Sequence, residues 1–368
     1  MRILLCSDLH LGMKFAGYPD AQERLVEARF ACLTRIVAAA NDSRCDLLVI
    51  AGDLFERVAV SRRDIQRAAA ALRGFQGRLA AVMPGNHDYI APDDELWPRF
   101  ADACGDSALV LDQPRPYSLG HFDLDACLYP GPCTAKHSDV NAIAWVRAAS
   151  RDPAVRHRIG IAHGSVEGFS PDMEGRYFPM SMRELTEAGM HLWLLGHTHV
   201  RFPAAPGARD TVFCAGTPEP DGFDCRHEGS VLVVELDENN AVSVRTIRTG
   251  AYRFREETIA IRQASDLSSA AILAEDPEAA SSMMRLRLKG SVPRDVIASL
   301  GDMRTRMARS FLHLDLRSDE LREEITRDTI DRLYPVGSIP HSLLLRLAER
   351  GDQEALEAAR ELLSGMRA

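Results

Sequence analysis

Carboxylate, amide and imidazole side chains recur in five short segments that lie far apart in this sequence. The segments are Asp8-Leu9-His10, Gly52-Asp53, Gly85-Asn86-His87-Asp88, His163-Gly164 and Gly196-His197-Thr198-His199. A mixed set of Asp, Asn and His ligands suits two divalent transition-metal ions about 3.5 to 4 Å apart, with one carboxylate shared between them. Asp53 is the natural shared ligand. Two such cations lower the pKa of water, so the expected chemistry is attack by a hydroxide that bridges them.

Each of these segments directly follows a short apolar run that predicts a buried strand. The runs are residues 3–7, 47–51, 79–83, 159–162 and 192–195. Residues 21–40 have the spacing of an amphipathic helix, and Ser61 is a candidate N-cap for a second helix. This alternation predicts an α/β fold. Because ligands in open α/β sheets gather outside the carboxyl ends of the strands, the five segments should converge on one crevice.

Two local features of these segments predict backbone geometry. Asp8 and His10 alternate with Leu9, so an extended backbone would place the carboxylate and the imidazole on the same side. The glycines of the other segments should allow turns with positive φ, and they are Gly52, Gly85, Gly164 and Gly196.

Asp88, next to His87, is expected to orient the loop that carries both residues and not to bind metal.

The sequence changes character after the last of these segments. Residues 231–236 and 242–247 flank a polar turn and predict a hairpin that completes the large domain. After about residue 250, strands at 258–261, 284–288 and 311–316 alternate with helices at 266–274 and 293–307. The tail, 342–366, predicts one amphipathic helix that is interrupted near Gly351. We therefore expect three parts: residues 1–250, a small α/β domain at 251–335, and a helical tail at 336–368.

The order DxH, GD, GNHD, a single His and GHxH resembles the signature of the calcineurin-like metallophosphoesterases. The resemblance implies an α/β fold in which two sheets form a sandwich flanked by helices, with a small α/β capping domain and a C-terminal helix. It also implies two metal positions. The first would be held by Asp8, His10, Asp53 and His199, and the second by Asp53, Asn86, His163 and His197. His87 would face the scissile phosphate as a catalytic residue.

The opening MRILLCSDLHLG and the later LVIAGDLF look like the SbcD-type branch of that family, together with its YhaO-like bacterial relatives. This resemblance implies a manganese-dependent exonuclease, with endonuclease activity also open, that hydrolyses phosphodiester bonds in DNA repair, including repair of double-strand breaks. Iron and zinc are alternative metals. The implied partners are DNA and an SMC-like coiled-coil ATPase, and a homodimer stays open. Leu9 departs from the aromatic residue that this branch often has between the Asp and the His.

Alternative functions are a phosphodiesterase for small substrates such as cyclic nucleotides, and a non-catalytic binding subunit. Three further residues are candidates for substrate binding. His227 lies in a polar segment soon after GHTH, while Arg285 and Arg287 alternate on one predicted strand, where a solvated strand face is the simpler interpretation. The C-terminal helix could dock on an ATPase coiled coil or pack on its own domain.

Composition limits the broad class of protein. Apolar residues make up 46% and charged residues 26% of the 368 residues, which is typical of a globular protein. The net charge of −9 argues against bulk electrostatic coating of nucleic acid, so DNA would need local arginine clusters. The eight cysteines include no CxxC pair and are expected to be reduced and mostly buried. No apolar run is long enough for a membrane span, and we expect a cytoplasmic protein.

Overall fold

The computed structural model describes residues 1–93, 95–170, 174–207, 209–351 and 353–365. The chain divides into two compact units, Met1–Phe254 and Arg255–Ala368. The three-part division expected from the sequence stays a prediction.

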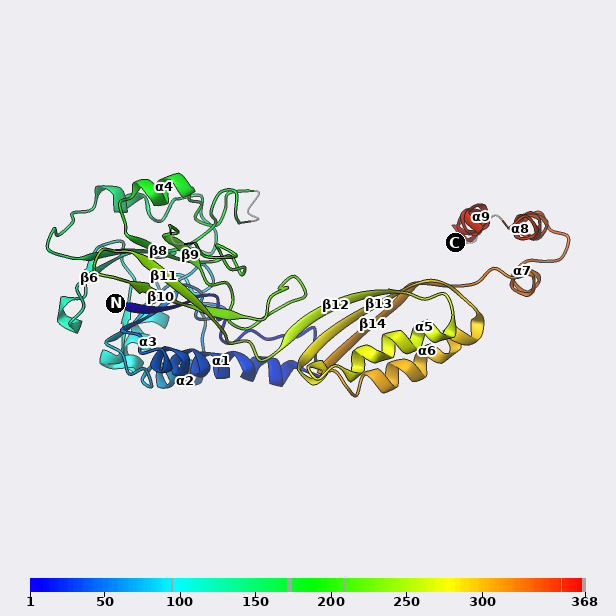
Figure 1. The fold of residues 1–368 in the computed structure, drawn as a ribbon, viewed down its shortest axis with the longest axis horizontal. Coiled ribbons are helices and arrows are strands. Elements are labelled where there is room, and N and C mark those ends of the chain that lie inside the picture. The colour runs from blue at the N-terminus through cyan, green and yellow to red at the C-terminus, as the bar shows by residue number, and fades with distance from the viewer. Residues whose placement is uncertain (94, 171–173, 208, 352, 366–368) are drawn as a thin grey trace. The chain divides into compact units, whose positions relative to one another are not determined.

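Two sheets form the centre of the first unit (Figure 1). One has the strand order β11-β10-β1-β2-β3-β4, and the other has the order β5-β6-β7-β8-β9. The strands of the first sheet are β1 (Arg2–Cys6), β2 (Leu47–Ala51), β3 (Leu79–Met83), β4 (Ala108–Val110), β10 (Ser230–Leu236) and β11 (Val242–Arg248). Those of the second are β5 (Tyr117–Ser118), β6 (Ala126–Gly131), β7 (His157–His163), β8 (Leu192–Gly196) and β9 (Val212–Cys214).

The strands that precede the five predicted segments run parallel within their sheets. β1 pairs with β2 and β2 with β3 in parallel, and β7 pairs with β8 in parallel. Their carboxyl ends therefore lie at one edge of each sheet, which brings the following loops together. β10 and β11 are antiparallel, which confirms the predicted hairpin.

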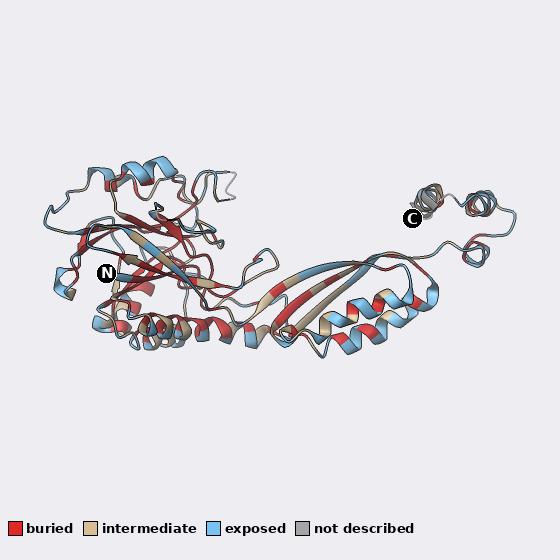
Figure 2. Ribbon diagram, in the orientation of Figure 1, coloured by how far each residue is buried: buried red, intermediate tan, exposed pale blue. Residues whose placement is uncertain are grey.

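Both faces of each sheet are covered, which explains why the central strands are apolar throughout. Ile3 and Val49 of the first sheet share a core with Ile161 and Leu194 of the second, so the sheets pack face to face as a sandwich. Figure 2 shows these strands almost entirely buried. The predicted two-sheet α/β fold is confirmed.

Helices cover the outer faces of the sandwich. α1 (Gln22–Asp42), α2 (Arg62–Leu72) and α3 (Leu96–Cys104) pack on the first sheet, and α4 (Met182–Glu187) packs on the second (Figure 1). Ser61 caps α2 by accepting a hydrogen bond from the Asp64 backbone N–H, as predicted. Short 3-10 helices span Gly105–Ser107, Gly120–Phe122 and Ala144–Ala148 in the first unit, and Leu273–Glu275 and Ala279–Ser281 in the second. All eight cysteines are unpaired and buried.

The second unit contains a three-stranded sheet with helices on one face. Its strands are β12 (Arg253–Ala260), β13 (Ser282–Val292) and β14 (His313–Glu323), in that order, and its helices are α5 (Ala264–Ile272) and α6 (Arg294–Met307). Met284 and Leu286 of β13 pack against Leu267 of α5 and Met303 of α6. The last strand extends to Glu323, seven residues beyond the predicted end. The sheet and its helices otherwise follow the predicted order.

The tail forms a separate cluster of helices. These are α7 (Arg327–Leu333), α8 (Ile339–Glu349) and α9 (Gln353–Gly365), and α7 had no counterpart in the prediction. Gly351, with a φ of 70°, lies at the predicted interruption between α8 and α9. Met366, the predicted end of the amphipathic helix, lies outside the described residues. Ile330, Tyr334, Leu344 and Leu356 form the core of this cluster.

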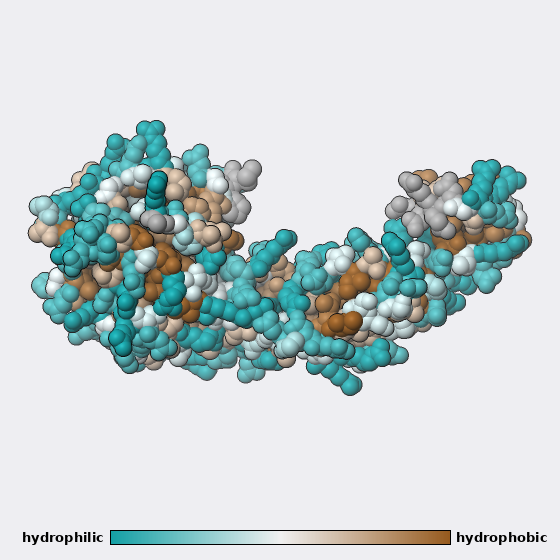
Figure 3. Space-filling model, viewed as in Figure 1, coloured by the Kyte–Doolittle hydropathy of each residue, from teal (hydrophilic) through white to brown (hydrophobic). Residues whose placement is uncertain are grey.

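The face shown in Figure 3 is largely hydrophilic, with hydrophobic side chains visible among the polar ones on both units. Among the helices that the structure describes, none combines the length and the apolar character that crossing a membrane would require.

Candidate metal centre

The segment Asp8-Leu9-His10 runs alongside the loop that follows β2, in the same direction. The backbone N–H of Asp8 donates to the carbonyl of Gly52 (3.1 Å), and that of His10 donates to the carbonyl of Asp53 (3.0 Å). Asp8 and His10 have φ angles of 57° and 48°. The predicted extended backbone is therefore wrong. The reason is that hydrogen bonds to the neighbouring loop, and not strand alternation, set the direction of both side chains.

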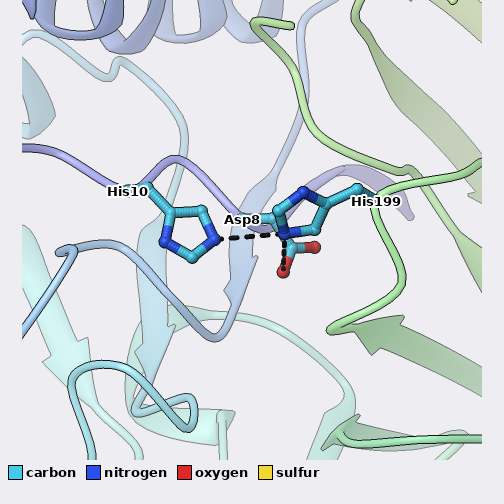
Figure 4. A group of neighbouring side chains, drawn as sticks. All are labelled: Asp8, His10 and His199. Carbon is cyan, nitrogen blue, oxygen red and sulfur yellow. Dashed lines mark hydrogen bonds and ion pairs between the residues drawn. The ribbon is translucent and has the colours of Figure 1, made fainter. Parts of the chain in front are cut away.

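Asp8, His10 and His199 form a close group (Figure 4). The Nε2 atoms of His10 and His199 are 3.2 Å apart, and His199 Nε2 lies 3.8 Å from Asp8 Oδ1. Asp8 and His10 are buried, whereas the side chain of His199 is 36% exposed. The backbone N–H of His197 donates to the Asp8 carboxylate at 3.1 Å, which joins the first and last predicted segments.

Asp53 lies between the two sides of the site. Its Oδ2 is 3.6 Å from His10 Nε2 and 3.2 Å from His163 Nε2. Its Oδ1 accepts a hydrogen bond from the backbone N–H of His87 (2.8 Å). A single buried carboxylate therefore faces imidazoles from both sides, which is the placement a shared ligand needs. Its role as the bridging ligand stays a prediction.

Asn86, His163 and His197 make up the other side. Asn86 Oδ1 is 3.0 Å from His163 Nε2 and 3.0 Å from His197 Nδ1. His163 Nδ1 lies 2.9 Å from the carbonyl of Ala51, so a neutral backbone acceptor orients this ring. Asp8, Asp53 and His163 also form a group whose donor atoms lie within 4.8 Å of one another, close enough to share a cation. The structure thus brings all seven predicted ligands into one centre.

His87 lies at the edge of this centre. Its Nδ1 is 3.1 Å from the carbonyl of Glu56, and its ring meets that of His10 edge to face, with the centroids 4.7 Å apart. The side chain is 30% exposed, so it can reach a substrate. Because His87 also groups with His10 and Asp53 at metal-binding distances, its predicted role outside the metal ligands stays a prediction.

In these segments glycine is needed mainly because neighbouring atoms lie too close to leave room for a Cβ, and less because of a positive φ. Only Gly52 has a left-handed φ, at 93°, so the expectation of positive φ is wrong for the other three glycines. A Cβ on Gly85 would lie 2.2 Å from Asp53 Oδ1, and one on Gly196 would lie 2.1 Å from the carbonyl of Ala51. A Cβ on Gly164 would meet a backbone carbonyl at 2.4 Å. These loops pack so tightly that only hydrogen fits at these positions.

Asp88 is fully buried and ties two loops together. Its Oδ2 accepts a hydrogen bond from the backbone N–H of Phe55 (2.9 Å), and its Oδ1 accepts one from that of Gly85 (2.7 Å). Burial, together with the neighbouring charge of Asp53, raises the pKa of Asp88 to about 7. These contacts agree with a role in holding the loops.

The buried carboxylates of the centre favour positive charge on neighbouring imidazoles. Burial opposes protonation of His163 and His199, but Asp53 beside His163 and Asp221 beside His199 raise both pKa values to about 9. Burial and His163 lower the pKa of His197 to about 4. Burial would raise the pKa of Asp53, but His163 and His10 hold it far below its usual range. The raised pKa values of His163 and His199 favour protonation of these two imidazoles beside the buried carboxylates.

The donor set fits divalent transition metals. Two buried carboxylates, an amide oxygen and four imidazoles are the oxygen and nitrogen ligands that such ions prefer. The protons that the histidines hold are those that metal binding would release. The buried Asp and His groups are therefore consistent with a dimetal site.

Sequence reasoning missed three residues that contact this centre. Glu56 Oε2 lies 2.9 Å from His10 Nδ1, and Asp221 Oδ2 lies 2.9 Å from His199 Nδ1. Arg29, in α1, is buried with its Nη2 3.5 Å from Asp221 Oδ2. Asp221 lies in the same polar segment as His227. The acidic residues of that segment were therefore the sequence feature that could have indicated a carboxylate near the centre.

The three substrate-binding candidates have defined contacts. His227 Nε2 lies 2.6 Å from the carbonyl of His199, so this imidazole supports the backbone of a predicted ligand. Arg285 and Arg287 belong to the second unit. Arg285 Nε contacts Asp315 Oδ2 at 3.0 Å, and Arg287 Nε contacts Glu256 Oε1 at 2.5 Å. Both guanidinium groups are thus paired with carboxylates in this structure, and their predicted contact with DNA stays a prediction.

Residues 1–201, more than half of the chain, match the calcineurin-like phosphoesterase family, Metallophos. The chain therefore belongs to this family, and with its buried Asp and His groups it is a metal-dependent phosphoesterase.

Among individual proteins, the chain is similar to the uncharacterized metallophosphoesterase YhaO of Bacillus subtilis (strain 168). The two are 24% identical over 298 residues, which cover 77% of this chain and 68% of YhaO. It is also 24% identical over 241 residues to the DNA double-strand break repair protein Mre11 of Methanopyrus kandleri, covering 61% of this chain but only half of that protein. The crystal structure of TT1561 of Thermus thermophilus aligns with a TM-score of 0.36 and 13% identity, over 66% of this chain and 97% of that chain.

Proposed function

We propose that this metal-dependent phosphoesterase is a nuclease that hydrolyses phosphodiester bonds of DNA, acting as an exonuclease with manganese. The observation that carries the proposal is the similarity to a protein named for DNA double-strand break repair, which covers 61% of the chain. The further similarity to YhaO covers 77% of the chain, so the relationship includes sequence beyond the 201 residues of the family match.

The residues of the centre have complementary tasks in this proposal. Asp8, His10 and His199 would hold one cation, and Asn86, His163 and His197 the other, with Asp53 serving both. Two bound divalent cations supply a lowered water pKa and neutralise charge on phosphoryl oxygens.

His87 would act on the phosphodiester without holding metal. The Glu56 carbonyl can only accept a hydrogen bond, so His87 Nδ1 carries the hydrogen of this contact and Nε2 stays available for a second one. Nearly a third of its side chain is exposed. In its protonated form, with a hydrogen on Nε2 as well, His87 can donate a hydrogen bond to a phosphoryl oxygen or pass that proton to the leaving oxygen.

The decisive experiment compares substrates on the full chain. The protein is incubated with Mn²⁺ and linear duplex DNA labelled at one end, single-stranded DNA, closed circular DNA, a chromogenic phosphodiester and cyclic AMP. We expect the linear duplex to shorten progressively from its ends, and Asp53→Asn to give the background rate. Hydrolysis of cyclic AMP with all DNA substrates left intact would contradict the proposal and favour a small-substrate phosphodiesterase. Shortening that survives excess EDTA would contradict the metal requirement.

Partners are a further part of the proposal. We propose that the second unit contributes to DNA binding, and that an SMC-like ATPase or a second copy of the chain assembles with the protein. Since Arg285 and Arg287 already pair with carboxylates, DNA would have to replace those contacts. The Arg285→Ala/Arg287→Ala double variant should then bind duplex DNA more weakly, with a shallower dependence on salt, while hydrolysing the chromogenic phosphodiester normally. Unchanged affinity and salt dependence would exclude these two arginines.

A further inference from the structure

The two histidines that face Asp8 each have a carboxylate at their outer ring nitrogen. In His10, Nδ1 lies 2.9 Å from Glu56 Oε2, and in His199, Nδ1 lies 2.9 Å from Asp221 Oδ2. In both rings Nε2 is the inner nitrogen, and the two Nε2 atoms face one another at 3.2 Å. Both imidazoles therefore have a carboxylate within ion-pair distance of the outer ring nitrogen and the site in front. The contact between His10 and Glu56 lacks hydrogen-bond geometry, since His10 Nδ1 and Glu56 Oε2 have no hydrogen-bond partner among the described residues.

The histidines on the other side lack this arrangement. The outer nitrogen of His163 faces the neutral carbonyl of Ala51 at 2.9 Å. Among the described residues, the one carboxylate within ion-pair distance of the His163 ring is Asp53, on its inner side, and the His197 ring has none. His197 instead places Nδ1 3.0 Å from Asn86 Oδ1 and packs its ring against Tyr177. The two halves of the centre therefore differ in the charge that supports their imidazoles.

Arg29 connects the supporting carboxylate Asp221 to the segment that carries Asp8 and His10. This buried guanidinium donates from Nη1 to the carbonyl of Leu9 (2.6 Å) and reaches Asp221 Oδ2 with Nη2 (3.5 Å). The hydroxyl of Thr217 donates to the carbonyl of Asp8 (2.9 Å). The loop that carries Asp221 is thus fixed to the backbone of the first metal-binding segment.

We propose that Glu56 and Asp221 are positioning residues that make the position formed by Asp8, His10 and His199 the tighter of two unequal metal positions. A carboxylate that accepts the Nδ1 hydrogen fixes the imidazole tautomer, so that the Nε2 lone pair points at the metal. The carboxylate also makes that nitrogen a stronger donor. A backbone carbonyl behind His163 fixes a tautomer too, but it contributes no negative charge. The inference concerns metal binding alone and is independent of whether DNA is the substrate.

The test measures binding of Mn²⁺ to the metal-free full chain by calorimetry, with electron paramagnetic resonance of free Mn²⁺ as a second readout. The wild-type protein should bind two ions with clearly different affinities. Asp221→Asn and Glu56→Gln should each weaken the tighter step by roughly 10- to 100-fold and leave the weaker step unchanged. Asp224→Asn is the matched control, because it removes an exposed carboxylate from the same segment, and it should bind both ions like the wild type.

Several outcomes would overturn the proposal. They are two equal binding steps in the wild type, an unchanged tighter step in both variants, or an equal loss at both steps accompanied by a lower melting temperature of the metal-free protein. The last result would show that the carboxylates act only on the fold. If Asp221→Asn fails to fold by circular dichroism, Glu56→Gln decides the question, since Glu56 is 28% exposed and lies on a separate loop.

Discussion

Replacing Gly85 by alanine should disable the centre without removing any donor atom. The added Cβ would lie 2.2 Å from Asp53 Oδ1 and 2.3 Å from the Asp53 backbone nitrogen. Both neighbours belong to the residue that faces the two halves of the centre, and the nitrogen cannot rotate away as a side chain could. To reach an ordinary contact distance, the Asp53 carboxylate or the loop of Gly85 must move by about 1 Å. A displacement of about 1 Å at a reacting centre can reduce the rate by ~10²-fold.

We therefore expect Gly85→Ala to lower kcat/KM for a chromogenic phosphodiester by ~10²-fold with saturating Mn²⁺. The overpacked loop should also destabilise the protein by about 1–3 kcal/mol, which urea unfolding would show. The rate is measured at a temperature where circular dichroism confirms that the variant is folded.

The matched control is Gly301→Ala in α6, where a Cβ would meet nothing within 4 Å. This substitution should keep full activity and stabilise the protein by up to ~1 kcal/mol, because alanine is the better helix former. A Gly85→Ala protein with the kcat/KM of the wild type would refute the argument, since the close approach of the two loops would then have no consequence for the position of Asp53.

Three other predictions address single groups of the centre. His87→Ala should lose roughly 10²- to 10⁴-fold in rate while elemental analysis finds its metal content unchanged, and loss of an ion would instead make His87 a ligand. Asp88→Ala should lower the free energy of unfolding by about 2–6 kcal/mol, because two buried backbone N–H groups lose their acceptor at about 1–3 kcal/mol each, and an unchanged urea midpoint would contradict this. The metal-free protein should lose stability as pH rises from 6.5 to 9, since folded His163 and His199, with pKa values near 9, keep protons that the unfolded chain releases above about 6.5. A melting temperature that rises over that range would show that these pKa values are not raised.

Local patterns predicted the elements and the convergence of the five segments. An apolar run such as that of β2 or β3 is read directly from the residues, because a strand covered on both faces must be apolar throughout. Once such strands are parallel, their following loops must meet at one edge. The positions of Asp53 and His163 therefore followed from the order of the motifs along the chain.

Contacts between loops could not be predicted in this way. The directions of Asp8 and His10 depend on hydrogen bonds to residues 44 and 43 positions later, which a rule based on strand alternation ignores. Asp221 contacts His199 only in the folded chain, and no spacing in the sequence indicates that contact. Gly85 was recognised as necessary, but its reason is the volume of a neighbouring loop and not its own φ.

Four side chains of the centre stand on backbone that L-residues rarely adopt: Asp8, His10, Asp53 and His197 have φ angles between 48° and 88°. A left-handed conformation costs a non-glycine residue about 1–3 kcal/mol. Glycine at Asp8 or Asp53 would also leave the backbone N–H of His197 or His87 without its carboxylate acceptor. In a directed-evolution experiment that selects only for thermal resistance, glycine at His10 or His197 would relieve that strain without this loss and would be enriched. Each such gain would delete a predicted metal ligand, so a selection for stability needs a concurrent screen for phosphodiester hydrolysis, or its most heat-resistant clones will be inactive.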